Sequence, residues 1–101
     1  MIIIRKDNER LTVTGHSNNS LQDKTEITTQ ACACVTTAVQ MMLFGLVNIV
    51  HDDVRYEIEK GHFLLDLSSL QKDDSFLLLN TFVFTVKALQ EAYPNCIDVQ
   101  F

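Results

Sequence analysis

A long apolar segment, residues 31–50, constrains the fold of this chain more than any other feature. Its length is close to that of a membrane-spanning helix. However, polar residues such as Thr36 and Gln40 interrupt it, and only His51 and acidic residues follow it, where a membrane span usually has basic anchors. We therefore expect no membrane association and interpret the segment as a helix buried on most sides, shared between a sheet and a partner.

Four further segments have the pattern of strands, and a turn sequence separates the members of each pair. In the cleanest of them, Val54, Tyr56 and Ile58 alternate with charged residues. Each pair is therefore expected to form a hairpin. The expected hairpins are residues 2–14, with a turn at Asp7-Asn8, and residues 54–67, with a turn at Lys60-Gly61.

A second helix and a final strand complete the prediction. Asp73-Asp74-Ser75 is expected to cap the helix, because acids are favourable at the positive end of the helix dipole. Pro94 ends that helix, and residues 97–101 alternate as a strand. The order β-β-α-β-β-α-β predicts an α+β fold with two helices packed on one face of a mostly antiparallel sheet. We expect residues 1–101 to form a single domain.

Charge and cysteine content limit the classes of function. The net charge is −5 and the isoelectric point about 4.9. Direct nucleic-acid binding is therefore not expected, since contacts to phosphate require clustered basic residues. The chain has three cysteines, an odd number, and its first residues do not resemble a secretion signal. These features predict free thiols and a cytoplasmic location.

Cys32 and His16 are the candidate reactive groups. Thr28 or Thr29 is expected to cap the long helix, which would place Cys32 in its first turn. Unpaired backbone N–H groups and the helix dipole favour a thiolate at that position. A histidine from a preceding turn can accept the thiol proton, which is the minimum required of a cysteine nucleophile. The polar segment at about residues 17–27 is expected to be an exposed, flexible loop.

The spacing of these groups resembles that of the ribosomal-processing cysteine protease family. Gly15-His16-Ser17 follows a strand, and Cys32-Ala-Cys-Val-Thr36 opens a helix after a loop. Members of that family carry Gly-His-Ala and Cys-Ala-x-Val-Ser at these places. The similarity continues through Gly61-His-Phe63 and the Ala-Leu-Gln-Glu-Ala-Tyr end of the second helix, so it covers nearly the whole chain.

The resemblance implies a cysteine protease that removes the N-terminal extension of a ribosomal large-subunit protein, number twenty-seven of that series. It implies a homodimer without metal or organic cofactor. By position, Cys32 matches the nucleophile and His16 the general acid and base, with Gly15 and Thr36 as supporting residues. Two departures are that Ser17 replaces the usual alanine and that no acid stands three residues before Cys32.

A mechanism follows as an expectation from the resemblance and the helix start. Cys32 attacks the carbonyl at the end of the extension, and His16 protonates the leaving amine. Backbone N–H groups at the start of the helix are expected to stabilise the oxyanion. Residues 17–26 are expected to close over the peptide and bring His16 toward the thiol.

The other thiols and histidines have simpler interpretations. Cys34 is the competing nucleophile, but two positions along a helix rotate a side chain by roughly 200°, so Cys32 and Cys34 cannot face the same cleft. We therefore assign Cys34 to the core, and Cys96 is expected to be an apolar residue at the start of a strand. His51 and His62 are expected to be structural, and a zinc site is not favoured because the histidines are scattered.

Two other functions remain open at this point. The chain could be a non-catalytic dimeric α+β module that binds a partner, or a thiol-based redox sensor. Apolar residues occupy more than one face of both expected helices, and a single sheet face cannot cover them all. Self-association would cover the remainder. The additional apolar residues are Met41, Phe44 and Val47 in the first helix and Leu77, Phe84 and Ala88 in the second.

Overall fold

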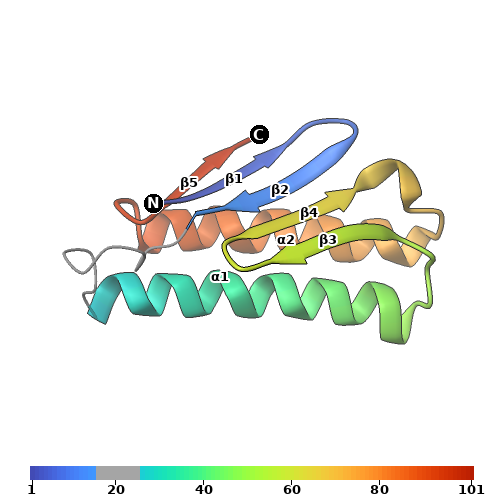
Figure 1. Cartoon of the computed structure of the whole chain (residues 1–101), viewed down its shortest axis with the longest axis horizontal. Coiled ribbons are helices and arrows are strands. Elements are labelled where there is room, and N and C mark those ends of the chain that lie inside the picture. The colour runs from blue at the N-terminus through green and yellow to red at the C-terminus, as the bar shows by residue number, and fades with distance from the viewer. Residues whose placement is uncertain (16–25) are drawn as a thin grey trace.

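A five-stranded sheet carries both helices on one of its faces (Figure 1). The computed structural model describes residues 1–15 and 26–101. The strand order across the sheet is β3-β4-β2-β1-β5. The elements are β1 (Ile2–Lys6), β2 (Arg10–Thr14), α1 (Glu26–Phe44), the π-helical segment η2 (Gly45–Ile49), β3 (Arg55–Glu59), β4 (His62–Asp66), the 3₁₀ turn η3 (Leu67–Ser69), α2 (Asp73–Ala92) and β5 (Ile97–Gln100).

The pairing of the strands confirms the predicted α+β fold. Both expected hairpins are present, and β2 also pairs with β4, so that three of the four strand pairs are antiparallel. The remaining pair, β1 with β5, is parallel. Asp7 forms the first turn, where its Oδ1 atom accepts hydrogen bonds from the N–H groups of Glu9 at 2.7 Å and Arg10 at 2.8 Å.

The long apolar segment forms most of α1 and η2, but within one chain it is not buried on most sides as expected. One face of α1 is buried, whereas residues on its opposite face remain exposed. At Gly45 the helix lies so close to α2 that a Cβ atom would come 2.7 Å from Cδ1 of Leu78. Together α1 and η2 are long and apolar enough to cross a membrane, a property shared with core helices of soluble proteins. The buried residues of α1 are Ala31, Val35, Val39, Met42 and Leu43.

Asp73 and Asp74 lie in the first turn of α2 as predicted, and Asp52 binds the residues that lead into this helix. Lys72 occupies the N-cap position and its side chain makes no capping bond. Instead, Oδ2 of Asp52 accepts hydrogen bonds from the N–H groups of Gln71 at 2.9 Å and Lys72 at 3.1 Å, and from the Ser75 hydroxyl at 2.6 Å. Asp52 lies on the connection after η2, so a residue distant in the sequence holds the start of α2 in place.

Strand β3 forms as predicted but is not buried. All of its five residues are exposed, including Tyr56 at 41% and Ile58 at 55%. It is the outermost strand of the sheet and pairs on one side only, with β4. The clear alternation of this segment therefore marks a strand whose apolar side remains open at the sheet edge.

Candidate active site

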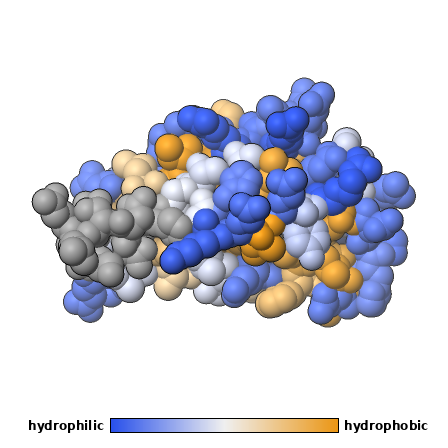
Figure 2. Space-filling view, in the orientation of Figure 1, coloured by the Kyte–Doolittle hydropathy of each residue, from blue (hydrophilic) through white to orange (hydrophobic). Residues whose placement is uncertain are grey.

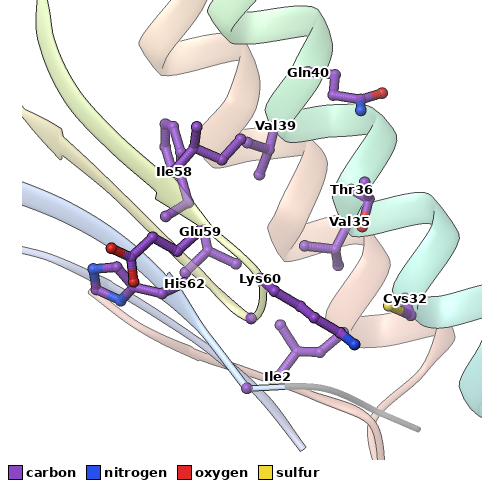
Figure 3. A pocket seen from close by; sticks show the side chains of 14 residues that line it. Ile2, Cys32, Val35, Thr36, Val39, Gln40, Ile58, Glu59, Lys60 and His62 are labelled. Carbon is purple, nitrogen blue, oxygen red and sulfur yellow. The ribbon is translucent and has the colours of Figure 1, made fainter. Parts of the chain in front are cut away.

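Cys32 lines a pocket of about 270 Å³ between α1 and the sheet (Figure 3). Side chains of α1 form one wall, and the turn between β3 and β4 forms the opposite wall. Apolar side chains dominate the interior, which suits part of a peptide side chain more than a charged group. The lining residues are Ile2, Val13, Gly15, Cys32, Val35, Thr36, Val39, Gln40, Ile58, Glu59, Lys60, Gly61, His62 and Phe63.

Cys32 does not lie in the first turn of its helix, contrary to the sequence-based expectation. Helix α1 begins at Glu26, and Glu26 and Ile27, which were expected to end the flexible loop, are helical. Only the first four N–H groups of a helix lack a partner within it, and Cys32 is the seventh residue of α1. The expected oxyanion site at the helix start is therefore wrong, because the amides around Cys32 are committed to the helix.

Thr36 stands one helical turn after Cys32 and lines the same pocket. The half-buried Cys32 and the exposed Thr36 place a thiol and a hydroxyl beside each other on α1, while Val35 and Val39 form the apolar part of that wall. The predicted supporting position of Thr36 at the site is thus consistent with its location. Its role in a reaction stays a prediction.

Gly15 brings the end of β2 to the rim of the pocket. Its φ angle is +95°, a conformation that favours glycine, and an added Cβ atom would collide with the Met1 carbonyl oxygen. The Gly15 N–H group donates a 3.0 Å hydrogen bond to the Gly61 carbonyl oxygen in the β3–β4 turn. The next residue is His16, which lies outside the described residues, as does the rest of the expected loop up to residue 25.

Cys34 faces away from this pocket, but it is not a core residue. It is half-buried, whereas Cys96 has only 5% of its surface exposed. The Cys34 thiol lies beside the Tyr93 side chain, beyond the end of α2. Partial burial and this thiol raise the pKa of Tyr93 above its ordinary value. The expected burial of Cys34 is therefore wrong, and the expected separation of its side chain from that of Cys32 is confirmed.

Lys60, which the sequence pattern did not single out, is the charged side chain that crosses the pocket. It extends from the β3–β4 turn toward the Cys32 end of α1, whereas the side chains of Glu59 and His62 point away from that helix (Figure 3). The Lys60-Gly61 turn was predicted, but its position opposite Cys32 depends on strand pairing. Within residues 1–15 and 26–101, no group of three histidine, cysteine or acidic residues is arranged to hold a metal ion.

The comparisons with known proteins identify the family and the fold. The family model described as cysteine protease Prp matches residues 1–98. A search of curated sequences found no match. The fold is similar to that of the ribosomal processing protease Prp from S. aureus in complex with a covalently linked product peptide, with 15% identity, a TM-score of 0.75 and coverage of 98% of this chain and 95% of the other.

Two other solved structures share the fold. One is the S. aureus Prp in complex with a substrate peptide, at 13% identity and a TM-score of 0.78, with coverage of 98% of this chain and 95% of the other. The second is SMU.848 from Streptococcus mutans, at 22% identity and a TM-score of 0.78, with coverage of 98% and 88%. At these identities the structures establish the fold, and the match over residues 1–98 establishes the family.

Proposed function

The chain belongs to the cysteine protease Prp family, and we propose that it removes the N-terminal extension of ribosomal large-subunit protein number twenty-seven. The observation that carries this proposal is the placement of Cys32 in an apolar pocket. Two similar structures are of a ribosomal processing protease, one holding a substrate peptide and the other a covalently linked product peptide. A pocket with a free thiol at its edge suits the same type of substrate.

Cys32 acts in this proposal as the nucleophile and His16 as the general acid and base. The thiolate attacks the carbonyl carbon at the end of the extension, and the peptide C–N bond breaks as His16 protonates the leaving amine. Water then attacks the thioester, with His16 accepting its proton, and the C–S bond breaks. The position of Gly15 supports this assignment, because it begins the His16 segment at the rim of the Cys32 pocket.

The Cys34 thiol is the natural internal control for the assignment. It lies on the same helix and is also half-buried, but it does not line the pocket. We infer that it takes no part in cleavage. Contact with the pocket, rather than exposure, therefore distinguishes Cys32 from Cys34.

Incubation with the extended and the truncated ribosomal protein, followed by mass spectrometry, tests the proposal. The native chain should shorten the extended form at a single peptide bond and leave the truncated form unchanged. Cys32→Ala should abolish cleavage, and Cys34→Ala should retain it. If the extended protein keeps its full mass after incubation with the folded native chain, the proposed substrate is ruled out. If Cys32→Ala cleaves as well as the native chain, Cys32 is ruled out as the nucleophile.

We further propose that the chain functions as a cytoplasmic homodimer. Large apolar side chains remain exposed on the outer sides of both helices, among them Met41 at 69%, Leu77 at 65% and Phe84 at 73%. Figure 2 shows hydrophobic residues exposed on the surface between hydrophilic ones. Exposed apolar area of this kind usually meets a partner, and a second copy presents a complementary apolar surface.

A further inference from the structure

The Lys60 side chain is a cation at the site of the proposed reaction that has no partner among the described residues. It lines the pocket with Cys32 and extends across it toward that end of α1 (Figure 3). Within the described parts of the chain, the one salt bridge joins Arg55 and Asp66, and Lys60 makes no hydrogen bond with its side chain. Its ammonium group is therefore available to a ligand in the pocket.

The acidic residue beside Lys60 does not neutralise this charge. Glu59 is the one acidic residue among those that line the pocket in the described structure, and its carboxylate points away from α1. Glu59 lies opposite His62 in the β3–β4 register, and its side chain projects from the other face of the sheet than that of Ile58. Lys60 thus presents its charge on the same side as the thiol, above apolar walls.

Hydrolysis of a thioester creates a negative charge at this place. Water oxygen bonds to the acyl carbon, the C–S bond breaks, and the sulfur retains the electron pair as a thiol after taking a proton. The released acid loses its proton near neutral pH and becomes a carboxylate. In the intact substrate the same carbon belongs to a neutral peptide group. The charge therefore appears beside Cys32 only after cleavage, whichever way the rest of the peptide runs.

We propose that Lys60 binds the new C-terminal carboxylate of the released extension, so that the product is held more tightly than an uncharged peptide of the same sequence. This inference rests on the proposed function. The role of Lys60 is to distinguish product from substrate and to position the carboxylate end. A partly exposed ion pair contributes about 1 kcal/mol, which corresponds to an affinity difference of about fivefold.

Binding of two peptides tests this role without requiring turnover. The peptides have the sequence of the extension, one with a free C-terminal carboxylate and one with a C-terminal amide. Both are titrated by calorimetry into the full chain carrying Cys32→Ala, which removes the thiol. The acid should bind about fivefold more tightly than the amide. Adding Lys60→Met should remove that difference, and Lys60→Arg should preserve most of it.

Lys87→Met is the matched control, because it removes the same charge from the outer part of α2. Lys87 lies over the Phe84 and Phe101 rings, with its Nζ atom 5.7 Å from each ring centre, and does not line the pocket. Lys87→Met should leave the ratio of the affinities for the acid and the amide peptides unchanged. Equal binding of both peptides to the chain with native Lys60 would overturn the role of Lys60 while leaving the proposed substrate intact. Binding of neither peptide would overturn both.

Discussion

The Gly15 N–H group donates a 3.0 Å hydrogen bond to the carbonyl oxygen of Gly61. This bond joins the end of β2, one residue before His16, to the turn that carries Lys60. Both glycines have positive φ angles, +95° for Gly15 and +78° for Gly61. Two segments distant in the sequence are thereby fixed to each other on the side of the pocket opposite Cys32.

Gly15→Ala is expected to destabilise the fold and to reduce cleavage. The positive φ angle disfavours a side chain, and the new Cβ atom would collide with the Met1 backbone. Strain of this kind costs about 1–3 kcal/mol. Urea unfolding measures the loss. Gly45→Ala is the comparison, because its Cβ atom would meet only the flexible end of Leu78; equal losses in both variants would contradict the strain argument.

Asp52→Asn is expected to reduce stability at neutral pH and to weaken the acid dependence of unfolding. The hydrogen bond from Ser75, followed by that from the Gln71 N–H group, lowers the pKa of Asp52 below its ordinary value of 3.8. A lowered pKa stabilises the folded state above pH 3.8, and this contribution is lost as the pH falls from there through the folded-state value.

Denaturant unfolding at neutral pH and near pH 3 measures this effect of Asp52. The native chain should lose more stability between the two conditions than Asp52→Asn does. Asp53→Asn serves as the control, because the Asp53 side chain is exposed and makes none of the bonds to α2. An identical acid response of the native chain and Asp52→Asn would exclude the carboxylate as the source of the pH dependence.

His16→Ala is expected to slow alkylation of Cys32 by iodoacetamide without changing that of Cys34. A thiol reacts as its thiolate, so loss of a base that accepts its proton lowers the rate. Cys96, with 5% exposed surface, should react only after unfolding. Peptide mapping by mass spectrometry separates the three positions. Equal alkylation rates of Cys32 in the native and His16→Ala chains would exclude His16 as the base that accepts the Cys32 proton.

Phe84→Glu is expected to convert the proposed homodimer into a monomer. Phe84 is 73% exposed on α2, and a charge placed in an apolar interface loses its hydration without a partner. Sedimentation or light scattering gives the mass in solution, and circular dichroism confirms that the fold persists. The matched control is Asn8→Glu, which places the same charge in the exposed turn between β1 and β2, away from both helices. A native chain that is already monomeric would contradict the proposed assembly.

The amino-acid sequence alone predicted the order of the elements, both hairpins and the chemical identity of the proposed site. These features are local: apolar periodicity sets helix or strand, and turn residues such as Asp7 and Gly61 set where the chain reverses. The spacing between a histidine and a later cysteine, together with the identity of the neighbouring residues, indicated the family that the match over residues 1–98 shows.

Only the tertiary structure decided the surroundings of these residues. Threonines that resembled a cap did not begin α1, because the helix extends back to Glu26 and so moves Cys32 away from its start. Asp52 bonds to the start of α2 from a distant part of the chain, and Lys60 reaches the Cys32 pocket because β3 and β4 pair at the sheet edge. Such contacts depend on which elements pack together, and a local pattern of residues does not encode that long-range geometry.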